Sequence, residues 1–118
     1  MKTLDGLSLA LLISLGCAPV TTITPLSSHS YPTKPQGCDI QILTQGPTNR
    51  KYEELAILST VTSGAAMAKD LNAMLPSIKA AACALGADAV LIKNVEPGSL
   101  GSQNATGKAY TVAIKYLD

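Results

Sequence analysis

The chain of 118 residues contains no phenylalanine, no tryptophan and a single histidine, His29. Without phenylalanine and tryptophan, it lacks the usual platforms on which nucleic-acid bases stack. Nine lysines and arginines stand against eight aspartates and glutamates, and the scattering of the two signs argues against a nucleic-acid partner. One histidine cannot supply a multi-histidine metal site. Because His29 also lies in a segment that we expect to be an unstructured linker, no histidine-based triad is predicted.

The apolar run at residues 7–15, LSLALLISL, is too short to be a membrane-spanning helix. Nine helical residues cover about 14 Å, whereas the hydrocarbon core of a bilayer is roughly 30 Å thick. Lys2 precedes the run and the small residue Gly16 follows it. This order of a charged start, an apolar middle and a small-residue exit is typical of a secretory signal peptide.

The pair Gly16–Cys17 at the end of this run resembles the lipobox of bacterial lipoproteins. In that family the signal is removed before the cysteine, which then carries acyl chains. The resemblance implies a signal peptide at residues 1–16, lipid attachment at Cys17 and a membrane as partner through the lipid. Ala18 stands where aspartate would favour inner-membrane retention in enteric bacteria, so the analogy implies the outer membrane. The alternatives are an ordinary signal peptide with an incidental cysteine, or a buried apolar helix.

The sequence contains three cysteines, and in an oxidising compartment an odd number leaves one thiol that can form a wrong disulfide. If Cys17 is acylated, Cys38 and Cys83 remain as one possible disulfide. Closing a loop of about 45 residues would stabilise the fold by roughly 4 kcal/mol in the chain-entropy model. Two buried free thiols and a redox pair remain as alternatives, although neither cysteine lies in a C-x-x-C context.

A change of composition after Cys17 predicts two further parts of the chain. Residues 17–37 are rich in proline, serine and threonine and have no sustained period, so we expect a flexible tether. Residues 38–118 have regular patterns and are predicted to form the globular domain.

Within that domain the patterns predict a four-stranded sheet and one helix. The expected strands cover residues 38–43, 52–61, 89–95 and 108–116. The expected helix covers residues 75–85, with Pro76 near its first position and Gly86 just past its end. A single helix that begins earlier and kinks at Pro76 is the alternative.

Two of the predicted strands differ in pattern. Residues 89–95 are apolar on both faces, which is typical of a covered central strand. The last strand alternates, and one set of side chains is expected to point inward: Tyr110, Val112, Ile114 and Tyr116. The other set is expected to point outward: Thr111, Ala113 and Lys115. The predicted fold class is therefore α+β, with two layers in the order β-β-α-β-β and one helix packed on a face of the sheet.

Three phrases in this order, KYEELAIL, LGADAVLI and GKAYTVAIKY, resemble the periplasmic domain of RcsF-like outer-membrane lipoproteins, which sense envelope stress. The resemblance covers residues 38–118 and implies a non-catalytic binding or sensor module that faces the periplasm, with another envelope protein as partner. LGADAV alone is similar to the YbjQ-like proteins, described as heavy-metal binders that assemble into rings. That similarity implies the alternative function, an oligomeric protein that binds a small ligand or a metal.

No motif in the sequence predicts an enzyme, a cofactor or a metal site. Glu53 and Glu54 are adjacent on a predicted strand, so their side chains point to opposite faces and do not converge as an acid and a base. The glycine-rich segment 98–107 before Lys108 joins two strands, whereas a phosphate loop opens a helix. Asn104 matches a glycosylation acceptor, which carries no expected role in a bacterial lipoprotein.

Overall fold

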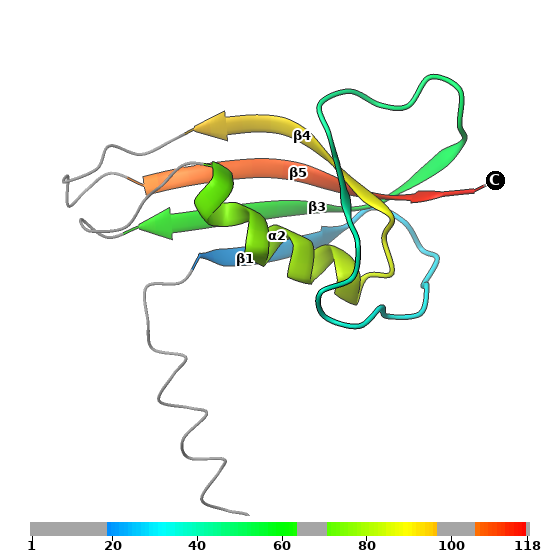
Figure 1. Ribbon diagram of the computed structural model, residues 1–118, viewed down its shortest axis with the longest axis horizontal. Coiled ribbons are helices and arrows are strands. Elements are labelled where there is room, and N and C mark those ends of the chain that lie inside the picture. The colour runs from blue at the N-terminus through cyan, green and yellow to red at the C-terminus, as the bar shows by residue number, and fades with distance from the viewer. Residues whose placement is uncertain (1–18, 64–70, 97–105, 118) are drawn as a thin grey trace, which may run out of the picture.

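The computed structural model describes residues 19–63, 71–96 and 106–117. In chain order the elements are β1 (Val20–Pro25), β2 (Gln41–Leu43), β3 (Tyr52–Ser63), α2 (Leu71–Ala84), β4 (Ala89–Glu96) and β5 (Thr106–Tyr116). The strands form one mixed sheet in the order β1-β3-β5-β4-β2, and α2 lies across one of its faces (Figure 1). The predicted α+β class is confirmed, but the sheet has five strands where the sequence predicted four.

The additional strand is β1, in the segment that the sequence predicted to be a flexible tether. Val20–Pro25 pairs antiparallel with β3, with Val20 opposite Val61 and Pro25 opposite Ala56. The prediction was wrong because the serine- and proline-rich composition of residues 17–37 conceals the run VTTIT, five β-branched residues that favour an extended strand. Pro25 is compatible with this position because β1 is an edge strand and Pro25 is its last residue.

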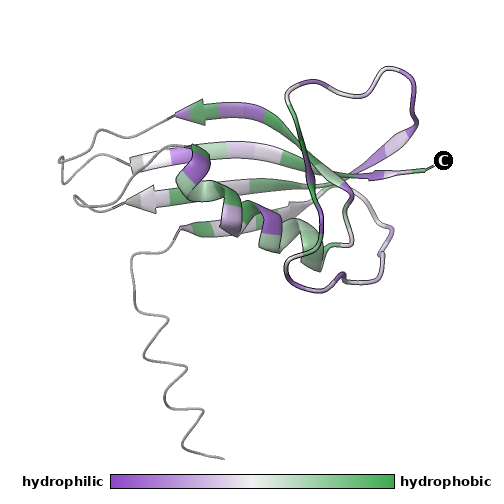
Figure 2. Ribbon diagram, viewed as in Figure 1, coloured by the Kyte–Doolittle hydropathy of each residue, from purple (hydrophilic) through white to green (hydrophobic). Residues whose placement is uncertain are grey.

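Two consecutive strands, β2 and β3, are not neighbours. The predicted strand 38–43 is shortened to Gln41–Leu43, which pairs parallel with β4 at the far edge of the sheet. Because β5 and β4 lie between β3 and β2, the loop 44–51 must cross the end of the sheet. The hydrophilic sequence TQGPTNRK of this loop separates the more hydrophobic strands (Figure 2).

The helix begins earlier than the preferred prediction of residues 75–85. α2 runs from Leu71 to Ala84 with Pro76 inside it, so the alternative of a single helix through the proline describes it better. Proline cannot donate a hydrogen bond to the carbonyl of Asn72, four residues earlier. Both Pro76 and Asn72 are exposed, so water can reach that carbonyl and the missing bond costs less than it would in a buried helix.

The end of α2 matches the glycine stop expected at Gly86. Gly86 has a φ of 75°, and its N–H donates to the carbonyl of Cys83 at 3.0 Å. The N–H of Ala87 donates to the carbonyl of Ala82, also at 3.0 Å. These two bonds form a Schellman motif, in which a left-handed residue lets the chain leave the helix while its last carbonyls stay bonded.

The sheet carries an apolar layer on each face. The layer beneath α2 joins Met74, Ile78 and Ala82 of the helix to small and branched residues of the sheet, among them Leu58 and Ala113. The layer on the opposite face consists of Ala89, Leu91, Val112 and Ile114, bordered by Leu43, Tyr52, Ile57 and Tyr116. The buried residues Ala89, Val90 and Leu91 confirm that the first part of β4 is covered on both faces, whereas Lys93, Asn94 and Glu96 in its second part are exposed.

This arrangement corrects the predicted orientation of β5. Thr111 and Ala113, expected to point outward, are fully buried, and Ala113 packs in the layer beneath α2. Tyr110, expected to point inward, is exposed. Val112 and Ile114, also expected to point inward, are buried as predicted, but in the layer on the face opposite α2. The alternation was identified correctly, and the error was to expect one buried face, because α2 packs on the side of the smaller residues, where its backbone can approach the sheet.

Candidate functional site

The disulfide predicted between Cys38 and Cys83 is present and joins the segment before β2 to the end of α2. The two Cα atoms are 6.0 Å apart, and Cys83 is only 1% exposed. Disulfides persist in oxidising compartments, so the bond suggests an extracytoplasmic location. Both sulfurs are consumed by the bond, so neither is available as a thiolate ligand for a metal.

The segment before Cys38 closes the carboxyl end of α2. The backbone N–H of Lys34 donates to the carbonyl of Cys83 at 2.8 Å, and the Thr33 hydroxyl donates to the carbonyl of Ala84 at 2.8 Å. These bonds satisfy two of the carbonyls that the end of a helix leaves without an internal partner. Residues 33–38 therefore belong to the fold and do not act as a free tether.

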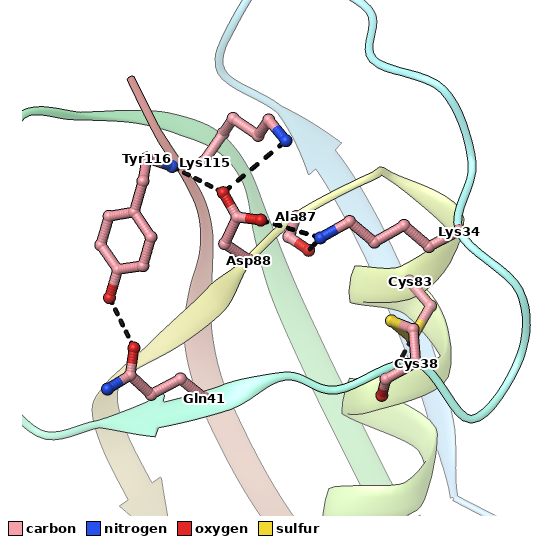
Figure 3. A network of polar contacts seen from close by, with 8 residues as sticks. All are labelled: Lys34, Cys38, Gln41, Cys83, Ala87, Asp88, Lys115 and Tyr116. Atoms are coloured by element: carbon pink, nitrogen blue, oxygen red, sulfur yellow. Dashed lines mark hydrogen bonds and ion pairs between the residues drawn. A yellow bond between two sulfur atoms is a disulfide. The ribbon is translucent and has the colours of Figure 1, made fainter. Parts of the chain in front are cut away.

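Asp88, the residue just before β4, holds three parts of the chain together (Figure 3). One of its oxygens, Oδ1, accepts a hydrogen bond from Lys34 Nζ at 2.8 Å, and Oδ2 accepts one from the backbone N–H of Tyr116 at 2.8 Å. Lys115 Nζ lies 3.7 Å from Oδ2, and Lys34 Nζ also donates to the carbonyl of Ala87 at 2.9 Å. Partial burial alone would raise the pKa of Asp88, but these donors and the charges of the two lysines lower it.

A second polar group, here named the Glu53 cluster, consists of Ser27, His29, Tyr31 and Glu53. Glu53 of β3 accepts hydrogen bonds from the hydroxyls of Ser27 and Tyr31, and its Oε2 lies 2.7 Å from Nδ1 of His29. The Ser27 oxygen also accepts the backbone N–H of His29 at 3.0 Å. His29 was predicted to be an unstructured linker residue, which is wrong: although its side chain is 70% exposed, its ring is fixed to the sheet through Glu53.

The donors around Glu53 stabilise its ionised form. Hydrogen bonds from Ser27, Tyr31 and His29, in that order of size, lower the pKa of Glu53 from 4.5 to about 2. The same contact raises the pKa of Tyr31, because its hydroxyl proton is held by the carboxylate and would leave a second negative charge beside it. Glu53 therefore stays ionised further into the acid range than an ordinary glutamate and acts as the common acceptor of the cluster.

Next to the cluster lies a cleft of about 290 Å³. Its polar wall is formed by Ser27, His29 and Tyr31, and its apolar wall includes Ile23 and Leu85. In a catalytic triad the histidine stands between the acid and the nucleophile. Here Ser27 and His29 both approach the same carboxylate, so Glu53 orients them as neighbours in a wall. This arrangement is suited to holding a small group by hydrogen bonds and apolar contact.

The Glu53 cluster should respond to acid. Because the folded-state pKa of Glu53 is depressed from 4.5 to about 2, its contribution to stability is present above pH 4.5 and is lost as the pH falls through about 2. We expect Glu53→Gln to be less stable than the wild type at pH 7 and the difference to shrink as the pH approaches 2. Urea midpoints measured at several pH values check this.

The control for that measurement is Glu54→Gln, which removes the same charge from the neighbouring exposed residue. It should leave the midpoint nearly unchanged at pH 7, because a surface substitution without buried partners has a small effect. If Glu53→Gln and Glu54→Gln behave alike at every pH, the cluster does not hold residues 27–31 on the sheet.

A second hollow, of about 620 Å³, follows α2 beside the disulfide. Asp39 and Lys79 lie on its walls, and Leu75 contributes apolar surface. None of the residues of the Glu53 cluster or of the group around Asp88 lies on its walls.

Several residues considered from the sequence as candidate sites lie outside the part of the chain that the structure describes: Cys17, Gly98, Gly101 and Asn104. Lys108, at the end of the glycine-rich segment, lies in β5 opposite Val61 and Glu96. Within the described ranges no group of three or more histidine, cysteine, aspartate or glutamate side chains is placed to hold a metal ion. In the same ranges, no helix has the length and hydropathy needed to cross a bilayer.

Sequence reasoning missed the Glu53 cluster because three of its four members lie in the segment taken as a tether. Their donors reach the sheet only because β1 brings residues 26–31 along the edge of β3, where the N–H groups of Leu26 and Ser27 donate to the carbonyl of Leu55 at 2.9 and 3.2 Å. The β-branched run before Pro25 was the available signal. Once that run is a strand, the residues just after it must pass close to the start of β3.

Together the fold and the Cys38–Cys83 bond define a small, disulfide-bonded α+β domain. No family model matches the sequence, and no curated protein matches it. Among solved structures, the chain is similar to the Francisella virulence factor FvfA, with a TM-score of 0.61 and 13% sequence identity. The similarity covers 80% of this chain and 96% of that one. At this identity the likeness concerns the fold alone.

Proposed function

We propose that the protein is an outer-membrane lipoprotein whose folded domain is a non-catalytic binding module facing the periplasm, of the kind that senses envelope stress in RcsF-like proteins. The observation that supports this most directly is the Cys38–Cys83 bond. It accounts for two of the three cysteines and leaves Cys17, at the end of the signal-like run, without either of them as a partner. In an extracytoplasmic protein, a remaining cysteine at the end of a lipobox-like sequence is the expected site of lipid attachment.

A binding role is supported by the way in which polar groups are used. The carboxylate of Glu53 serves three donors that fix the segment 27–31. Asp88 likewise serves donors from Lys34 and the backbone of Tyr116. In both groups the carboxylate holds chain segments in place, and at Glu53 this preorganises the polar wall of the cleft. Neither group sets a base against a nucleophile.

A test of the anchor is mass spectrometry of the mature protein isolated from its host. We expect an N-terminal fragment beginning at Cys17 that carries the mass of acyl chains, and a linked peptide pair lacking two hydrogens at Cys38 and Cys83. Acyl chains contribute about 0.8 kcal/mol per buried methylene, so two or three of them should keep the protein in the membrane fraction through a high-salt wash.

The matched variant for this test is Cys17→Ala, which leaves the disulfide intact. It should lose the acyl mass and leave the membrane fraction, because nothing else in the proposal binds the chain permanently to lipid. An unacylated, water-soluble wild type would refute the lipoprotein proposal. Crosslinking in intact envelopes addresses the binding role: another envelope protein should be captured, whereas capture of copies of this chain alone would favour the oligomeric alternative.

A further inference from the structure

Three exposed apolar side chains gather on the face of the sheet opposite α2. They are Val20, Val61 and Tyr110, which are 65%, 40% and 37% exposed and are here named the apolar corner. Val20 of β1 pairs directly with Val61 of β3. Tyr110 of β5 lies opposite Ser59, two residues before Val61 in β3. With strands about 4.8 Å apart and about 3.4 Å per residue, the three positions fall within about 15 Å of one another.

Neighbouring residues establish which face these side chains occupy. Thr21 and Thr60 are paired, their hydroxyls are 2.8 Å apart, and Thr21 also shares a hydrogen bond of 2.7 Å with Ser77 of α2. Because successive side chains alternate across a strand, Val20 and Val61 point away from the helix. Ala109, beside Tyr110, packs in the layer beneath α2, so Tyr110 also points away from it.

The apolar corner lies at the end of the sheet where β1 begins. Only two residues, Ala18 and Pro19, separate Cys17 from Val20. A chain step covers at most about 3.6 Å, so the Cα atom of Val20 is within about 11 Å of that of Cys17. The end of β5 lies at the opposite end of the sheet, where the C-terminus is marked (Figure 1).

Because Val20 lies so close to the proposed anchor at Cys17, even a weak contact between the apolar corner and the bilayer can form. A short connection to an anchored residue keeps the surface at a high effective concentration near the bilayer, so a patch of a few side chains suffices. Tyrosine favours the interface between hydrocarbon and water, where its ring is buried and its hydroxyl stays wet. Lys108, paired with Val61 on the same face, can extend its ammonium toward headgroups while its methylenes cover apolar surface.

Charge contributes little to this contact. Lys108 is paired on its other side with Glu96, whose carboxylate accepts a hydrogen bond from Asn94 at 3.1 Å. The positive and negative side chains of this pair balance one another, so the contact should depend on apolar burial and on the anchor, and little on salt.

We propose that the apolar corner of Val20, Val61 and Tyr110 rests on the interface of the bilayer to which Cys17 is attached, which orients the domain with the opposite end of the sheet away from the membrane. This inference rests on the proposed lipid attachment. The domain is then held at the membrane surface in a defined orientation, whereas a long flexible tether would leave it free to move around its anchor.

The absence of tryptophan from the sequence allows a direct test. Tyr110→Trp places a single fluorophore in the apolar corner, and Leu117→Trp places one at the opposite end of β5, where Leu117 is 54% exposed. Both positions are exposed, so both variants should fold. Each acylated mature variant is reconstituted into phosphatidylcholine vesicles with and without brominated acyl chains, and acylation of Cys17 is verified by mass spectrometry on the same sample.

We expect brominated lipid to quench Tyr110→Trp at least about twofold more strongly than Leu117→Trp, with a blue-shifted emission for the former. Equal quenching of the two variants, or none in either while Cys17 is acylated, would overturn the orientation and leave the lipoprotein proposal standing. A Tyr110→Trp fluorophore shielded from both brominated lipid and a water-soluble quencher would also overturn it, since a protein would then cover the corner. Absence of acylation would refute both proposals together.

Discussion

Replacing both disulfide cysteines, in Cys38→Ala/Cys83→Ala, is expected to lower the free energy of unfolding by about 4 kcal/mol. The bond closes a loop of 45 residues, so the unfolded chain gains conformational freedom when it is removed. A small domain has only about 5–15 kcal/mol of stability in total, so the loss is a large fraction of it. Urea unfolding of the oxidised wild type and the double variant measures the difference.

Reduction supplies the matched control. A thiol reductant should bring the wild type close to the midpoint of the double variant and should not change the double variant itself. Cys83 is almost fully buried, so a modest additional loss in the double variant would reflect the packing of its sulfur. If the reductant has no effect on the wild type, the two cysteines are not joined in solution and the argument for an oxidising location fails.

Comparing the wild type with the double variant also tests how residues 33–38, which pass over the end of α2, are held in place. Lys34 and Thr33 donate to the last carbonyls of the helix, and Cys38 is tied to the helix by its sulfur. Loss of the covalent link should therefore release residues 33–38 before the sheet itself unfolds. In native-state hydrogen exchange, protection of the Lys34 amide should fall more than protection of amides in β3 and β5, which lie in the centre of the sheet.

The sequence predicted the parts of the fold that follow from local patterns, and one long-range contact, the disulfide, that follows from the number of cysteines. The glycine after α2, the buried apolar strand β4 and the pairing of Cys38 with Cys83 follow from conformational freedom, hydropathy and cysteine count, and all three are present. What it did not predict depends on backbone pairing and packing between distant segments. β1 has an ordinary strand composition, but only its pairing with β3, at separations of 31 to 41 residues in the chain, distinguishes it from a linker.

The Glu53 cluster was hidden for the same reason. Ser27, His29 and Tyr31 precede Glu53 by 26, 24 and 22 residues, and no local pattern associates them. The orientation of β5 required knowledge of where α2 packs, because both of its alternating sets contain buried residues. Strand periodicity identifies two faces but does not say which one a helix will cover when both carry apolar residues.

Replacing Gly86, which ends α2, is the second change expected to have a large effect on the free energy of unfolding, because two separate energetic costs apply at this residue. Its φ of 75° lies in the left-handed region, which costs a residue with a side chain roughly 1–2 kcal/mol. In addition, a Cβ at this position would come within 2.5 Å of the carbonyl oxygen of Pro32 and 3.0 Å of the Cβ of Tyr31. The first neighbour is backbone, held in place by the bonds of Thr33 and Lys34 to the end of α2, so it cannot move aside without breaking them.

Gly86→Ala is therefore expected to lose about 3 kcal/mol, from the left-handed conformation and from crowding against the segment before β2. Gly37→Ala is the matched control, since Gly37 has a φ of 84° but no atom within 4 Å of an added Cβ. It should lose only about 1 kcal/mol, and the entropy that alanine removes from the unfolded chain is common to both variants. Urea midpoints compare them: a difference near zero would mean that residues 31–32 do not pack on Gly86, and the placement of the segment that carries Tyr31 would then be wrong.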